Sequence, residues 1–176
     1  MSIEDTASAV NDSKLLGRLY NALGQTESWQ GRRATKEAQE YLHKAATHIP
    51  KSSMLRANLA AYYFNSQQFE KAASYLSSIP SEEHSFANFY NIKGLLSVHD
   101  EQLEEAQGFF LEAIRLDPGF WEAQGNLGRL FIELDQLDKA RKVFVALHTN
   151  NPKHISPYIG LGNFFFDRAN GSIPES

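Results

Sequence analysis

The stretch WEAQGNLGRLFIELDQLDKARKVFVALHTNNP, residues 121–152, decides the fold, because the chain carries the same plan upstream. Residues 87–118, ANFYNIKGLLSVHDEQLEEAQGFFLEAIRLDP, place glycine, alanine, phenylalanine and proline at the same points 34 residues earlier (128 − 94). Residues 53–86 follow the plan in outline. A fixed period of this length indicates a stack of supersecondary units, each of which completes its apolar core against its neighbours.

Small residues and prolines recur at this step in three series: Ala60, Gly94, Gly128 and Gly162; Ala38, Ala72, Ala106 and Ala140; Pro118 and Pro152. Two helices joined by a short turn approach closely only where the side chains at their crossing are small. Glycine is less favourable than alanine inside a helix by about 0.5–1 kcal/mol. A glycine that recurs at the same position of successive repeats therefore indicates that a larger side chain would not fit there.

Each unit has the pattern of a helical hairpin. In residues 87–120, apolar residues recur at helical spacing on both sides of His99 and Asp100. The second run ends at Pro118 and Gly119, which do not continue a helix. The pattern predicts an all-α fold.

This pattern resembles the tetratricopeptide repeat family, which has a small residue in the first helix, alanine and then an aromatic residue in the second, and a closing proline. Residues 121–152 match closely, and residues 87–118 match well, although Ser97 stands where an aromatic residue is usual. Residues 53–86 match in their helices but end early. The resemblance implies a right-handed superhelical solenoid of helix-turn-helix repeats over residues 13–168.

The repeats and the ends divide the chain as follows: a flexible N-terminus at 1–12, an irregular repeat at 13–52, repeats at 53–86, 87–120 and 121–154, a half repeat at 155–168, and a flexible tail at 169–176. In the irregular repeat, Gly17 takes the small-residue place of the first helix. It precedes Ala38 by 21 residues, whereas this spacing is 12 in the repeat at 121–154 (140 − 128). We interpret the excess, around residues 24–31, as an extended loop between the helices.

Trp29 lies in this expected loop. It either folds back onto its own hairpin or contacts a partner, and packing is favoured because tryptophan is highly buried on average.

Composition excludes several functional classes. The formal net charge of −4 and the sequence pI of about 5.9 argue against a nucleic-acid partner, which needs a basic face. No apolar stretch approaches the roughly 20 residues of a membrane span, and residues 1–14 lack the apolar core of a signal peptide. The chain has no cysteine, which excludes thiol chemistry and fits a cytoplasmic protein.

No catalytic pattern occurs. The six histidines form no HExxH motif or i,i+4 pair, and no GxSxG or GxGxxG motif is present. We therefore expect no enzyme activity, no cofactor and no metal. The acidic and basic clusters near the starts of the second helices of the last two full repeats are interpreted as solvated outer faces.

The family resemblance implies a ligand groove on the concave side, lined by the first helices. The predicted lining residues are Ala57, Asn58, Ala61, Phe64, Asn65, Asn91, Leu95, Val98, His99, Glu122, Asn126, Arg129, Ile132, Glu133, Ile159, Asn163 and Phe166. Asn58 and Asn126 stand two periods apart (126 − 58 = 68). Their amides either bond a peptide backbone or bond the neighbouring repeat.

The predicted ligand is a protein or peptide segment of apolar to mixed character. Arg129 is the only basic residue among the predicted lining, and Glu122 and Glu133 flank it, so an acidic peptide meets repulsion. One branch of the family grips chaperone C-terminal carboxylates with a lysine and asparagine set. That set is absent here, because Ile159 takes the lysine place beside Asn163.

These features predict a non-enzymatic interaction scaffold or adaptor. The first alternative is a structural subunit, or a fragment of a larger repeat protein, held in a multiprotein assembly. A weaker alternative is an accessory domain of an enzyme.

The last half repeat ends without a second helix. Phe164 is expected to pack toward the preceding second helix, Phe165 toward the missing one and Phe166 toward the groove. Exposed phenylalanines form an apolar patch of the kind that marks an interface. We expect Phe164 and Phe165 to be covered by the same helix of a second copy, by another protein, or by the next helix of a longer solenoid.

Overall fold

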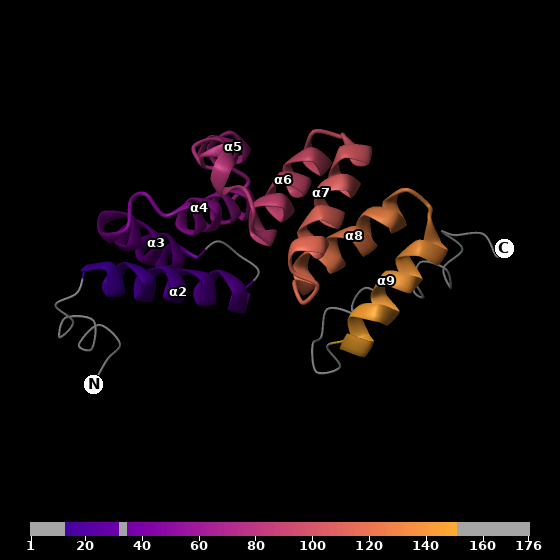
Figure 1. Cartoon of the computed structure of the whole chain (residues 1–176), viewed down its shortest axis with the longest axis horizontal. Helices are drawn as coiled ribbons and strands as arrows, with labels where there is room; N and C mark the ends of the chain where they lie inside the picture. Colours follow the sequence, from indigo (N-terminus) through magenta and orange to yellow (C-terminus); the bar gives the residue numbers. More distant parts are fainter. Residues whose placement is uncertain (1–12, 32–34, 151–176) are drawn as a thin grey trace. The chain divides into compact units, whose positions relative to one another are not determined.

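The computed structural model describes residues 13–31 and 35–150, and these ranges contain eight α-helices, one short 3-10 helix and no strand (Figure 1). In chain order the elements are α2 (Ser13–Gly31), α3 (Lys36–His48), α4 (Ser53–Asn65), α5 (Phe69–Ser77), η1 (Ser81–Glu83), α6 (Ala87–His99), α7 (Leu103–Leu116), α8 (Trp121–Glu133) and α9 (Leu137–Asn150). The all-α prediction is confirmed.

The chain forms two compact units, one ending at His84 and the other beginning at Ser85. In unit 1, α2 packs on α3 and α4 packs on α5, while α4 also contacts α2 and α3. In unit 2, α6 packs on α7 and α8 packs on α9, while α8 also contacts α6 and α7. Each unit is thus a pair of helical hairpins in which the two first helices touch.

Gly94 and Gly128, the recurring glycines of the first helices in unit 2, leave room for aromatic rings. A Cβ atom added at Gly94 would lie 2.6 Å from Cε1 of Phe110, and one at Gly128 would lie 2.5 Å from Cζ of Phe144. Real Cβ atoms essentially never come this close to another heavy atom. The steric need inferred from the sequence is confirmed.

The second hairpin meets the same requirement with different residues. It carries Ala60 in the glycine place and Leu76 in the phenylalanine place, one period before Gly94 and Phe110. Both are buried. A larger residue on the first helix thus accompanies a smaller residue on the second.

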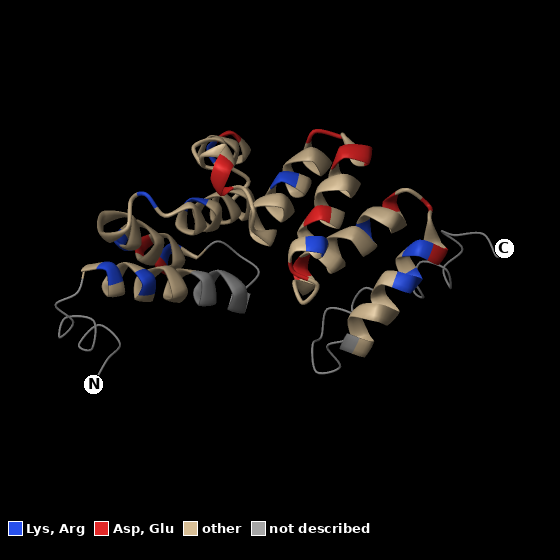
Figure 2. Cartoon of the chain, in the orientation of Figure 1, with Lys and Arg blue, Asp and Glu red and all other residues tan. Residues whose placement is uncertain are grey.

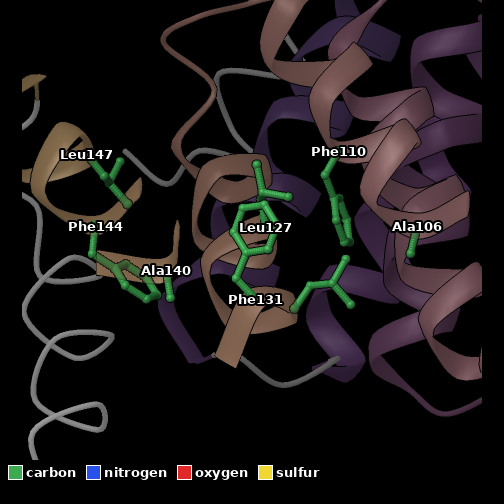
Figure 3. Packing of buried hydrophobic residues seen from close by; sticks show 8 residues of the cluster. Ala106, Phe110, Leu127, Phe131, Ala140, Phe144 and Leu147 are labelled. Carbon is green, nitrogen blue, oxygen red and sulfur yellow. The ribbon is translucent and has the colours of Figure 1, made fainter. Parts of the chain in front are cut away.

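The core of unit 2 continues from one hairpin to the next. Leu127 and Phe131 of α8 lie between Phe110 of α7 and Phe144 of α9, within one buried cluster (Figure 3). Phe110 and Phe144 are almost completely buried, at 1% and 2% exposure. Neither hairpin encloses this core alone, as expected for repeats that complete one another.

The turns inside the hairpins repeat as regularly as the helices. Gln67, Glu101 and Asp135 stand 34 residues apart and all have a positive φ, between 55° and 60°. In the turn at Glu101, the next residue, Gln102, donates its backbone N–H to the Ser97 carbonyl at 2.8 Å. This bond closes the end of the first helix in the manner of a Schellman motif.

The first hairpin differs from its prediction. α2 is a continuous helix from Ser13 to Gly31, so the expected extended loop around residues 24–31 is wrong. Gly24 also replaces Gly17 as the residue facing the second helix, since a Cβ at Gly24 would lie 2.6 Å from Cγ of Leu42. Leu42 is one period before Leu76. Gly17 instead packs against Ile49, beyond the end of α3.

With Gly24 as the reference, the first hairpin exceeds the others by two residues rather than nine. Gly24 precedes Ala38 by 14 residues, and Gly94 precedes Ala106 by 12. α2 is also longer than α8, with 19 residues against 13, and part of this extra length precedes Gly24.

The early end of the second hairpin is confirmed. α5 has 9 residues, whereas α7 has 14. The chain then turns back through η1, where Glu83 Oε2 accepts a hydrogen bond of 2.5 Å from Ser53 Oγ at the start of α4. Arg56 also donates to the Ser78 carbonyl. These bonds attach the connecting segment to α4.

Several predictions concern residues outside the described ranges. They are the flexible ends, the half repeat at 155–168 with Phe164, Phe165 and Phe166, and the groove positions Ile159 and Asn163. The side chain of Trp29 also lies outside the described part.

Candidate functional site

The predicted groove face of unit 2 mixes half-buried apolar residues with exposed charged ones. Leu95, Val98 and Ile132 pack partly against the core of the unit. Arg129 and Glu133 are exposed on α8, and His99 is exposed at the end of α6. This face therefore combines an apolar floor with polar groups at its surface.

Three of the five asparagines of the predicted groove, Asn58, Asn91 and Asn126, are buried and join first helices to one another. Asn126 Nδ2 on α8 donates to Asn91 Oδ1 on α6 at 2.7 Å. In unit 1, Asn58 Nδ2 on α4 donates to Asn21 Oδ1 on α2 at 2.8 Å. Of the two roles open to Asn58 and Asn126, the structure has the bond to the neighbouring repeat.

These two pairs use equivalent positions. Asn21 and Asn91 stand three residues before Gly24 and Gly94, while Asn58 and Asn126 stand two residues before Ala60 and Gly128. A buried amide needs a hydrogen-bond partner, so each pair fixes the register of adjacent first helices.

Arg129 extends the pair of unit 2 to the surface. Its guanidinium donates to Asn126 Oδ1, so the side chain is held over the face of α8. Arg129 itself remains exposed.

Glu122 is the unusual acid of this face. Its pKa is raised to about 7: burial raises the pKa, a hydrogen bond to its own backbone lowers it in part, and the nearby Asp117 adds a smaller rise. Its Oε2 atom is shielded from solvent and has no hydrogen-bond partner among the described residues. Near neutral pH, Glu122 therefore carries less negative charge than a free carboxylate.

Unit 1 presents a smaller part of the predicted lining. Ala57 and Asn58 are buried, Ala61 and Phe64 are half-buried, and Asn65 is exposed. Phe64 packs edge-on against Phe69 of α5, with ring centroids 5.3 Å apart. The accessible part of this face is thus small and mostly apolar.

Sequence reasoning missed two positions on these helices. Met54 and Asn88 stand two periods and one period before Glu122 (122 − 88 = 34), so the repeat places all three alike. Met54 is 47% exposed, and Asn88 is half-buried. Because both stand at the repeat position of Glu122, the 34-residue period alone could have identified Met54 and Asn88.

Two other groups of charged residues lie outside the predicted groove lining. Acidic residues gather around the turn from α6 to α7, and basic residues lie near the start of α9 (Figure 2). Glu104 and Glu105 of α7 and Lys139, Arg141 and Lys142 of α9 are all exposed. The solvated outer faces predicted from these clusters are confirmed.

The described ranges contain no group of three or more histidine, aspartate or glutamate side chains that could hold a metal ion. Among the helices of residues 13–31 and 35–150, none combines the length and the apolar character required to cross a membrane.

Comparison with known proteins gives matches at the level of family and fold. The model of the tetratricopeptide repeat family matches residues 31–96 and 98–161. No curated protein sequence matches the chain.

Among solved structures, TTC0263, a thermophilic protein with these repeats from Thermus thermophilus, aligns with a TM-score of 0.73 at 15% identity, over 86% of this chain and 82% of its own. The Pseudomonas aeruginosa protein pilF aligns with a TM-score of 0.65 at 21% identity, over 88% and 69%. The second repeat domain of human RPAP3, in complex with the HSP70 peptide SGPTIEEVD, aligns with a TM-score of 0.54 at 17% identity, over 64% and 98%.

Proposed function

Because this chain belongs to the tetratricopeptide repeat family, we propose that it is a non-enzymatic scaffold that binds a peptide segment of another protein on the groove face of its first helices. The observation that carries the proposal is the combination of an apolar floor with exposed polar groups on α6 and α8. Binding sites of this kind pair apolar contact area with a few polar groups that fix orientation.

A solved relative supports the peptide as the class of ligand. The RPAP3 domain, which shares the fold over 98% of its own length, was determined with a bound peptide. That peptide is acidic at its end, and this chain lacks the lysine and asparagine set expected for such a ligand. We therefore propose an apolar to mixed segment.

The ligand class has a direct salt test. Contacts with Leu95, Val98 and Ile132 gain from removal of apolar surface from water, which depends little on ionic strength. The affinity of a bound peptide should therefore change little between low and moderate salt. A several-fold loss of affinity over that range would contradict the apolar to mixed assignment.

The proposal is tested with peptides selected from a random displayed library against the full chain. The groove variant combines His99→Arg with Glu133→Arg, and the matched outer-face variant combines Leu111→Arg with Glu105→Arg. Both variants raise the net charge by 3, from one neutral and one acidic residue each. We expect at least a tenfold loss of affinity, about 1.4 kcal/mol, only in the groove variant.

The alternative function, a structural subunit held by its outer face, has one specific observation in its favour. Leu111 of α7 and Val145 of α9 stand one period apart and are 46% and 47% exposed. If the outer-face variant loses affinity and the groove variant retains it, the alternative replaces our proposal. A cytoplasmic location accompanies the proposal and is supported by the absence of cysteine.

A further inference from the structure

The corrected register of α2 adds a basic residue to the groove face of unit 1. Arg18 stands six residues before Gly24, the small residue that faces the second helix (24 − 18). Met54 of α4 stands six residues before Ala60 (60 − 54), so it takes the equivalent place. Both side chains are exposed, that of Met54 to 47%. Arg18 and Met54 therefore belong to the same row of first-helix positions.

The hydrogen bond between Asn21 and Asn58 relates these two side chains in space. Arg18 stands three residues before Asn21 and therefore shares its face of α2. Met54 stands four residues before Asn58 and shares its face of α4. The amides join the two faces at 2.8 Å. Because the chain reverses at each end of α3, α2 and α4 run in the same direction, and Arg18 and Met54 lie on the same side of the amide pair.

The first helices of unit 1 are basic. Residues 13–26 of α2 contain Lys14 and Arg18 and no acidic residue, and α4 contains Arg56 and no acidic residue. The basic residues of α2 lie in its first half (Figure 2). Arg56 is bonded to the Ser78 carbonyl. Arg18 makes no hydrogen bond or ion pair with the described part of the chain, so its guanidinium is available to a ligand.

The equivalent places of unit 2 carry different chemistry. Asn88 stands three residues before Asn91 of α6. Glu122 stands four residues before Asn126 of α8. A ligand carboxylate therefore meets an amide and an acidic residue in unit 2, but an arginine and a methionine in unit 1. Because like charges disfavour binding and opposite charges favour it, this pattern directs a carboxylate to unit 1.

We propose that the groove face of unit 1 binds an acidic side chain of the ligand at Arg18 and an adjacent large apolar side chain at Met54. The positive charge of Arg18 and Lys14 complements the carboxylate. The flexible thioether of Met54 packs against apolar groups of varied shape. This inference rests on the proposed peptide function and specifies the ligand as a mixed segment in which one acidic residue adjoins a large apolar one.

A charge reversal tests the preference for an acidic residue. A random peptide library, fused at its C-terminal end so that no terminal carboxylate is free, is selected against the unmodified chain and against Arg18→Glu. The control is Lys36→Glu, which makes the same change of charge at an exposed residue of α3. Circular dichroism verifies the fold of both variants.

We expect the unmodified chain and the Lys36→Glu control to enrich peptides in which an acidic residue adjoins a large apolar one. The Arg18→Glu variant should enrich lysine or arginine at that position instead. Selected peptides without an acidic residue, or an unchanged acidic preference in Arg18→Glu, would overturn the proposal.

Methionine labelling shows directly whether the peptide lies on unit 1, because Met1 and Met54 are the only methionines of the chain. A selected peptide, synthesised with an amidated C-terminus, should shift the NMR signal of the carbon-13-labelled Met54 methyl group. Met54→Gln should weaken its binding at least about threefold, whereas Leu111→Gln, at a residue of matched exposure on the outer face, should leave it unchanged.

A double-mutant cycle measures the contact between Arg18 and the peptide carboxylate. Replacing the acidic residue of the peptide by its amide should weaken binding to the unmodified chain about threefold and binding to Arg18→Gln hardly at all. Equal losses in both chains would overturn the proposed contact.

The signals of the two units separate this inference from the proposed function. A peptide that shifts Leu95 and Val98 but leaves the Met54 methyl signal unchanged would overturn the inference and leave the proposed function in place. Peptides that leave the first helices of both units unchanged would overturn both.

Discussion

At the residue scale, the glycine of each first helix and the large residue of its partner helix form one packing unit. Gly128→Ala should lower the free energy of unfolding by about 1–3 kcal/mol, because the new Cβ overlaps the Phe144 ring. Adding Phe144→Leu should recover part of this loss, since the second hairpin uses alanine and leucine at these positions. Urea denaturation measures both.

Gly108→Ala is the control for the glycine effect. It lies in α7, and no described atom lies within 4 Å of an added Cβ, so alanine should raise stability by about 0.5–1 kcal/mol. Equal effects of alanine at Gly128 and Gly108 on the free energy of unfolding would show that overlap with the Phe144 ring does not destabilise the Gly128→Ala variant.

The charge state of Glu122 gives a pH-dependent stability. Its pKa is about 7 in the folded chain and near the ordinary 4.5 when unfolded, so the folded state favours the protonated form. The resulting stability is fully present below pH 4.5 and is lost as the pH rises through 7. The expected loss is on the order of 2 kcal/mol after allowance for solvent screening.

Glu122→Gln isolates this contribution. The variant should exceed the unmodified chain in stability at pH 8.5 and should lack the corresponding part of the decline from pH 5.5. Urea midpoints at the two pH values provide the comparison. Parallel pH profiles for both proteins would mean that the Glu122 carboxyl ionises normally.

At the element scale, buried amide pairs set the register between first helices. Asn126→Ile alone leaves Asn91 Oδ1 buried without its donor and should cost about 1–3 kcal/mol. Combining it with Asn91→Ala should be nearly neutral, because Ala57 and Ile92 occupy the same positions one period earlier. A double-mutant cycle by denaturation measures the coupling, and additive effects would contradict the paired role.

The elements show what the sequence could predict. The period placed the hairpins of residues 53–150, because packing on Gly94 and Gly128 requires the same small residues each time. It failed for α2, because the sequence around Gly17 resembles the later first helices and pointed to the wrong glycine. The contact between Gly24 and Leu42 identifies Gly24 as the equivalent residue, and only the structure reveals that contact.

The burial of individual groove residues could not be predicted for a related reason. The position along the helix identifies a face but not burial, so the sequence left open whether Asn58 and Asn126 bond a peptide or the neighbouring repeat. In the structure they bond Asn21 and Asn91. Met54, with the phase of Glu122, is exposed on α4. Burial depends on the neighbouring helix, which periodicity alone does not describe.

At the scale of the whole molecule, the phenylalanines of residues 164–166 make self-association testable. We propose that Phe165 contributes to an interface, because an exposed phenylalanine forgoes roughly 1.5–3 kcal/mol of burial. Sedimentation of the unmodified chain should show association that Phe165→Glu removes. A chain that stays monomeric at high concentration, with Phe165 accessible to solvent, would contradict the proposal that Phe165 contributes to an interface.

The central claim is that a peptide binds the groove face of the first helices. Its most direct test is NMR mapping of the full chain with a library-selected peptide. We predict that the largest chemical-shift changes fall on Leu95, Val98 and Arg129. Shifts concentrated on Leu111 and Val145, with the first helices unchanged, would contradict the account.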